Sequence, residues 1–155
     1  MEKLRIGFIP SHRDLMDEEF AESLRDYYFQ KLNSLEFVEL VAPDKNLVSR
    51  GLIRNDDDAL KVINLFSSYK LDAIVIGALT YGDERSALSI VENYINIPIF
   101  LFASSEPEIP KDKFFKSAAP CGMLPISFGL RRRDMNFTFG GIFKKDDIKF
   151  DSKFD

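Results

Sequence analysis

Short apolar runs alternate along the chain with longer segments in which apolar residues line one face of a helix. The apolar runs are short enough to be strands, and they cover residues 4–9, 37–42, 73–79, 98–103 and 137–143. Helices are expected between them, over residues 17–33, 55–69, 83–94 and about 117–133. The run 73–79 is apolar at nearly every position, which is typical of a strand with helices on both faces.

Polar residues at the predicted helix starts support these boundaries. Asp17 and the two glutamates that follow it place negative charge in a first helical turn, and Asn55 and Asp83 are suitable caps for the next two helices. The triplet at 56–58 also permits a metal hypothesis, but adjacent carboxylates at a helix start ordinarily interact with the helix dipole. Pro125 lies inside the last predicted helix, so that helix is expected to be kinked or to start later.

The order of the elements predicts the fold class. Strands that alternate with helices of this length are joined by right-handed crossovers and form a parallel sheet. We therefore expect an α/β, three-layer Rossmann-like domain, with a five-stranded, mainly parallel sheet between helices, over residues 1–143. Residues 144–155 are interpreted as a charged tail and as the start of a linker to a further domain.

Composition and charge narrow the classes of function. The 155 residues suit one domain, and a net charge of −4 with a single basic run at 131–133 argues against a nucleic-acid partner. No apolar run approaches the roughly 20 residues that cross a bilayer, so no membrane partner is expected. Because the lone Cys121 excludes an internal disulfide and the first residues lack a signal-peptide pattern, the cytoplasm is the expected compartment.

Phenylalanine is unusually frequent, with 15 residues in the chain. Most of these side chains are expected in an ordinary core. The alternative is that another domain or subunit covers part of this aromatic surface. The residues in question lie late in the sequence: Phe114, Phe115, Phe128, Phe137, Phe139, Phe143, Phe150 and Phe154.

Candidate binding residues follow the first and third predicted strands, because ligands of parallel α/β sheets bind beyond the carboxyl ends of the strands. Ser11, His12 and Arg13 follow the first strand, and Thr80 and Tyr81 follow the third. Hydroxyls, an imidazole, a guanidinium and a phenol ring suit a polyhydroxylated ligand such as a monosaccharide. The alternative is that polar residues follow strands in every fold of this kind, and that His12 is an ordinary solvent-exposed loop residue.

Other chemistries find little support in the sequence. Gly7 stands alone in the first predicted strand and no Gly-Lys-Ser occurs, which argues against a nucleotide-binding loop. With one histidine and one cysteine, a self-contained transition-metal site is not expected. Cys121 is interpreted as a small buried residue, and no residue of the chain is assigned a catalytic role.

Several segments carry a resemblance that spans nearly the whole chain. They are Arg5–Pro10 with its polar loop, Asp72–Tyr81, Ala119–Gly122, Gly129–Arg132 and Phe137–Phe143. In order and spacing the chain resembles the N-terminal domain of the L-fucose and L-arabinose isomerase superfamily. Such isomerases interconvert an aldose and a ketose through an enediol, with a manganese-like divalent ion polarising the sugar oxygens.

The resemblance implies a role in assembly rather than catalysis for this chain alone. In the family the acids and metal ligands lie in later domains, whereas the N-terminal domain packs against a neighbouring subunit and lends loop residues to its substrate pocket. Ser11, His12, Arg13, Thr80 and Tyr81 occupy the corresponding loops. A homo-oligomer that binds a monosaccharide is therefore expected. The second hypothesis is a stand-alone, non-catalytic module that binds a sugar or oligomerises.

Overall fold

Five parallel strands form one sheet in the order β2-β1-β3-β4-β5 within the part of the chain that the computed structural model describes, residues 3–107 and 115–154. The strands are β1 (Leu4–Ser11), β2 (Val38–Val41), β3 (Ala73–Ala78), β4 (Ile99–Ser104) and β5 (Phe137–Phe143). The helices are α1 (Glu18–Asn33), α2 (Asp56–Ser67), α3 (Glu84–Val91), α4 (Ala119–Arg132) and α5 (Ile148–Asp151), with a 3-10 turn at Ser49–Gly51. The predicted α/β, three-layer class is confirmed, and every strand pair is parallel.

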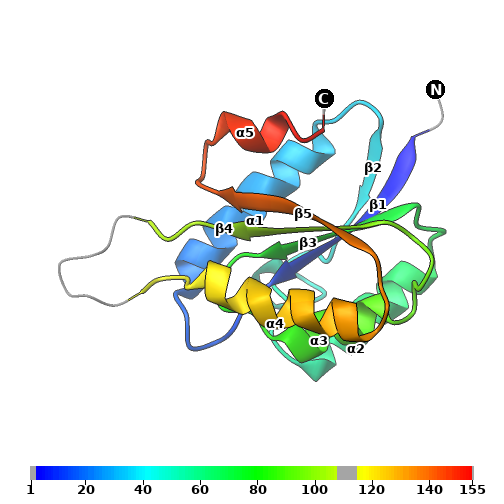
Figure 1. Ribbon diagram of the computed structural model, residues 1–155, viewed down its shortest axis with the longest axis horizontal. Coiled ribbons are helices and arrows are strands. Elements are labelled where there is room, and N and C mark those ends of the chain that lie inside the picture. Colours follow the sequence, from blue (N-terminus) through cyan, green and yellow to red (C-terminus); the bar gives the residue numbers. More distant parts are fainter. Residues whose placement is uncertain (1–2, 108–114, 155) are drawn as a thin grey trace.

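Helices cover both faces of the sheet (Figure 1). Helices α2, α3 and α4 lie on one face, and α1 and α5 lie on the other. Successive residues of β3 point to opposite faces, so that Ile74 and Ile76 pack in the core under α2–α4 while Val75 packs in the core under α1. This double burial explains why the run 73–79 is apolar throughout.

The caps predicted at Asn55 and Asp83 are present, and Asp17, predicted in the first turn of α1, is the N-cap of that helix. The Asp17 carboxylate accepts the N–H of Phe20 at 2.8 Å, and the Asn55 side chain accepts the N–H of Asp58 at 2.9 Å. Asp83 caps α3 in the same way. Asp58, the last member of the acidic triplet, is buried and accepts from both the backbone N–H and the Nε of Arg54.

The first strand continues past the predicted end at residue 9 and includes Pro10 and Ser11. Proline is tolerated there because β2 has already ended, its last pair with β1 being Gly7 and Val41. On the side of β1 that faces β2, Pro10 needs no N–H donor, and its carbonyl accepts the N–H of Ile53 at 2.9 Å. Ser11 is therefore a strand residue, 1% exposed, and not part of the loop.

The segment interpreted as a charged tail packs on the α1 face of the sheet through its aromatic residues. Phe150 in α5 is 1% exposed, and its ring centroid lies 4.9 Å from that of Tyr28 and 5.1 Å from that of Phe102. Phe154 packs on Phe100 with a centroid distance of 5.3 Å. The ordered domain thus extends beyond residue 143, and a linker function for the tail stays a prediction.

The late phenylalanines divide between core and surface. Phe143 and Phe150 are buried. Phe115, Phe128 and Phe139 are 64%, 63% and 49% exposed, so they are open to contact by another chain. Phe114 lies outside the described residues. In the parts described, no helix has the length and apolar character needed to cross a membrane.

Replacement of Phe150 tests whether α5 belongs to the core. We expect Phe150→Ala to lower the free energy of unfolding by about 3 kcal/mol, because a buried ring is lost and a cavity remains. Leu60→Ala on α2 is the control, and its exposed side chain predicts a change within about 0.5 kcal/mol. Urea denaturation followed by circular dichroism measures both. Equal stability of the two variants would show that α5 does not contribute to the cooperative core.

Candidate functional site

The candidate site lies where β1 and β3 end side by side. These strands pair from Ile6 with Ala73 to Ser11 with Ala78. The chain leaves β1 through α1 toward β2, and leaves β3 through α3 toward β4, in opposite directions along the sheet. Loops that diverge in this way leave a switch point, which is the usual ligand site of open parallel sheets.

Three of the five predicted binding residues are buried at this point. Ser11, His12 and Thr80 are 1%, 0% and 0% exposed. His12 Nδ1 lies 2.9 Å from Thr80 Oγ1, and the Thr80 hydroxyl also accepts the backbone N–H of Arg13 at 3.2 Å. The alternative of a solvent-exposed loop histidine is therefore wrong. Direct contact of these three side chains with a ligand stays a prediction. In the structure, His12 and Thr80 hold the backbone of the loop after β1 through the hydrogen bond to the N–H of Arg13.

The other two residues, Arg13 and Tyr81, form the accessible part of the site. The Arg13 guanidinium carbon lies 4.8 Å from the centre of the Tyr81 ring, within the range of a cation–π contact. Arg13 also lies 3.2 Å from a carboxylate oxygen of Glu84 and 3.9 Å from one of Asp83. Because both acids belong to the start of α3, that helix sets the position of the guanidinium.

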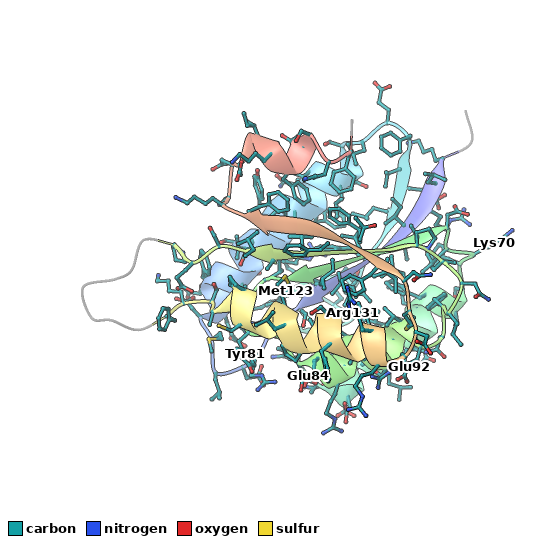
Figure 2. The ribbon with its side chains drawn as sticks, viewed as in Figure 1. Lys70, Tyr81, Glu84, Glu92, Met123 and Arg131 are labelled. Atoms are coloured by element: carbon teal, nitrogen blue, oxygen red, sulfur yellow. The ribbon has the colours of Figure 1, made fainter. Side chains whose placement is uncertain are left out.

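Helix α4 approaches the loop after β3 backbone to backbone. A Cβ atom on Gly122 would lie 2.7 Å from both Tyr81 Cα and Gly82 N, closer than real Cβ atoms come. Tyr81 consequently lies beside the first turns of α4 (Figure 2). The neighbouring Cys121 is exposed, so its interpretation as a buried packing residue is wrong, and Gly122 makes the close contact instead.

Two acidic residues that the sequence analysis did not single out adjoin His12. A ring nitrogen of His12 and one carboxylate oxygen each of Asp14 and Glu18 all lie within 4.8 Å of one another. Since Nδ1 is held by Thr80, Nε2 is the ring nitrogen left over, and it meets no hydrogen-bond partner among the described residues. Asp14 follows His12 closely in sequence, and Glu18 lies in the first turn of α1.

An arginine from a distant loop completes this group. Arg54 Nη1 lies 3.6 Å from Asp14 Oδ1 and 3.5 Å from Glu18 Oε1. It reaches the site because Ile53 pairs with Ser11 in an isolated parallel bridge at the end of β1. No local sequence signal indicates this approach, since it depends on how the segment after β2 crosses the sheet.

Burial lowers the pKa of His12 below its ordinary value. The nearby carboxylates of Asp14 and Glu18 act in the opposite direction, and the Arg54 guanidinium reinforces the lowering. The imidazole is therefore neutral at pH 7, with one nitrogen bonded and one nitrogen open.

At this sheet end the Arg13 guanidinium lies over the Tyr81 ring, and both side chains are partly exposed. Hollows of about 470 and 580 Å³ lie elsewhere: the first is lined by residues 95–99, 134 and 136–138, the second by parts of α2 and α3 and by Arg133. Arg13 and Tyr81 thus offer hydrogen-bond donors and a stacking surface for one side of a ligand.

A family model described as the N-terminal domain of fucose/sulfoquinovose isomerase matches residues 7–150. The chain belongs to this family. The match begins within β1 and ends in α5, so it includes the other four strands, most of β1 and the switch point. The resemblance drawn from the sequence is confirmed, and this isomerase-family domain reaches residue 150, past the boundary at 143. A search of curated proteins found no match.

The pH dependence of stability tests the buried state of His12 in the isomerase-family domain. Its folded pKa lies below the unfolded value of about 6.5, so the unfolded chain binds a proton that the folded chain does not. The contribution of neutral His12 to the free energy of unfolding is therefore fully present above the unfolded pKa, and it is lost as the pH falls toward the folded pKa. We expect the free energy of unfolding, measured by urea denaturation, to be lower at pH 5.5 than at pH 7.5; the limit for one proton with this unfolded pKa is about 1.3 kcal/mol.

The control is His12→Gln, which removes the titrating group. The variant will be less stable overall because a buried site is changed, so only the difference between the two pH values is compared. A wild-type loss that persists undiminished in His12→Gln would contradict the assignment, because the loss would then come from other groups.

Proposed function

We propose that this domain serves a sugar isomerase-like protein of carbohydrate metabolism by presenting Arg13 and Tyr81 to a monosaccharide and by making contacts in a homo-oligomer. Membership of the isomerase family supports the sugar as the ligand class. The observation that carries the proposal is the Arg13–Tyr81 pair. Both side chains are partly exposed at the switch point, next to the buried hydrogen bond between His12 and Thr80.

The chemistry of the pair suits a monosaccharide. Arginine carries five N–H donors in a fixed fork, and sugar hydroxyls accept hydrogen bonds. The tyrosine ring offers a flat face to the C–H side of a sugar ring and a phenol oxygen at its edge. Because Glu84 and Asp83 already orient the guanidinium, little side-chain freedom is lost when the sugar binds.

Ser11, His12 and Thr80 act in this proposal as positioning residues. Thr80 Oγ1 accepts the N–H of Arg13, and the same hydroxyl is bonded to His12. The backbone from which the guanidinium extends is therefore fixed by two buried side chains. Ser11 lies at the end of the β1–β3 ladder, where its carbonyl accepts the N–H of Leu79 at 3.1 Å.

Exposed apolar side chains support the oligomer contacts. On α4, Leu124 and Phe128 are 61% and 63% exposed, and on the edge strand β5, Phe139 and Ile142 are 49% and 47% exposed. Such a surface suits a neighbouring subunit. Because α4 packs directly against Tyr81, a subunit that covers α4 also comes close to the proposed sugar contacts.

The chain binds and orients the sugar in this proposal, and proton transfer is left to other domains. A manganese-like ion supplied there would polarise the sugar oxygens. The cytoplasm remains the proposed compartment. A gene whose reading frame continues past Asp155 into a segment rich in metal ligands supports the isomerase role. A stop codon at that point supports the stand-alone binding or oligomerisation module instead.

Replacement of Arg13 tests the sugar contact. We expect Arg13→Ala to weaken binding of L-fucose or sulfoquinovose about tenfold, because a charged hydrogen-bonding group contributes roughly 1.5 kcal/mol. The free energy of unfolding should change by less than about 0.5 kcal/mol, since the side chain is partly exposed. Isothermal titration calorimetry measures binding to the purified oligomer.

The matched control is Arg85→Ala on α3. Its side chain is 74% exposed and pairs with Asp56 at 2.9 Å, away from Arg13. Sugar affinity should be unchanged in this variant. If Arg13→Ala loses stability and affinity together, or binds both sugars as the parent does, the contact is not made by Arg13.

A further inference from the structure

Of the group formed by His12, Asp14 and Glu18, the sugar proposal uses only His12, and only as a positioning residue through Thr80. It combines one nitrogen and two carboxylate ligands within 4.8 Å of one another, at the end of β1 and the start of α1. Acidic clusters are common at protein surfaces without any ligand. This one differs because the imidazole beside it is 0% exposed and its Nε2 has no partner in the described part of the chain.

We propose that His12, Asp14 and Glu18 bind a divalent transition-metal cation, with Zn²⁺ as the reference ion. One imidazole and two carboxylates are ligands that such cations accept, and three protein ligands leave a fourth position for water. The proposal goes beyond the sugar function and does not depend on it, because neither Arg13 nor Tyr81, the proposed sugar contacts, is a metal ligand.

The hydrogen bond to Thr80 prepares the histidine for this role. A metal-binding histidine ordinarily donates its second ring N–H to a fixed acceptor, which sets the tautomer and the orientation of the ring. When Nδ1–H donates to Thr80 Oγ1 across the 2.9 Å separation, the lone pair of Nε2 is free for the metal. Burial favours the neutral imidazole that coordination needs.

The two carboxylates can close around an ion with small movements. Ligand atoms of a tetrahedral zinc site are roughly 3.4 Å apart for bonds of about 2.1 Å. The present separations are within 4.8 Å, so the side chains must approach by up to about 1.4 Å. Asp14 and Glu18 are 63% and 38% exposed and have rotamers available for this change.

Arg54 is the competing cation in the metal-free protein. Its Nη1 lies about midway between the two carboxylates, at 3.6 and 3.5 Å from them. A bound metal would take over these contacts, while the Arg54 Nε keeps its 3.2 Å bond to the buried Asp58. Removal of the guanidinium should therefore strengthen metal binding, because a competing positive charge is taken away.

The experiment uses ZnCl₂ alone and the full chain without a histidine tag. Because the chain has one histidine, the imidazole ¹⁵N resonances in NMR report on His12 without ambiguity. We expect one equivalent of Zn²⁺ to move the Nε2 resonance, and isothermal titration calorimetry to give a micromolar Kd. The exposed Cys121 is replaced by serine in the background, so that a thiol site cannot be mistaken for this one.

Variants separate coordination from surface charge. Asp14→Asn and Glu18→Gln should each weaken zinc binding at least tenfold, whereas Glu19→Gln, an exposed neighbour outside the group, should leave it unchanged. Arg54→Gln should raise the affinity severalfold, provided that circular dichroism shows the variant to be folded.

An Nε2 resonance that stays in place at zinc saturation overturns the proposal. So does binding that is equal in Asp14→Asn, Glu18→Gln and Glu19→Gln, because a non-specific acidic surface gives that result. Neither outcome affects the sugar proposal, which rests on Arg13→Ala.

Discussion

Parallel pairing of β1 with β3 is the constraint on which the rest of the structure depends. It forces the segment after β2 to cross the sheet, and that crossing brings Ile53 against Ser11 and Arg54 against the loop after β1. The same pairing places Thr80 beside His12. These contacts therefore join segments that are far apart in sequence. A shift of the β1–β3 register by one residue would turn the side chains of one strand to the opposite faces of the sheet and separate these pairs.

The buried hydrogen bond between His12 and Thr80 joins the ends of β1 and β3 beneath the partly exposed Arg13. The pair satisfies Nδ1, fixes the backbone of Arg13 and leaves a buried Nε2 that meets no hydrogen-bond partner among the described residues. In a region of low dielectric, such a partly satisfied polar group is costly unless a ligand or a charge compensates it. Two consequences follow. The Arg13 side chain is partly exposed to solvent, and the buried His12 imidazole keeps one ring nitrogen without a hydrogen-bond partner in the described part of the chain.

Local signals in the sequence were sufficient to predict most strands and helices. The arrangement of side chains in the candidate site depends on tertiary contacts. Apolar runs and the caps at Asp17, Asn55 and Asp83 predicted the strands and helices, because each depends on neighbours a few residues away. The same reasoning brought the five candidate residues together at the carboxyl ends of β1 and β3, and their contact with a ligand stays a prediction. The burial of His12 and the approach of Arg54 were not predictable, since both depend on a distant loop. The four-residue α5 was missed because packing of Phe150, rather than helix propensity, stabilises so short a helix.

Helix α4 connects the fold to its proposed assembly. Its inner side packs at backbone distance on the loop that carries Tyr81, through Gly122, while its outer side exposes Leu124 and Phe128. A partner that buries the outer side would restrict movement of α4. Because Gly122 has no side chain and touches the Tyr81 backbone directly, a shift of the helix would not be taken up by a change of rotamer at that contact. Any displacement of α4 would pass directly to Tyr81 and to the guanidinium stacked on it. Oligomer formation and sugar contact are therefore expected to be coupled through one helix, without a separate signalling element.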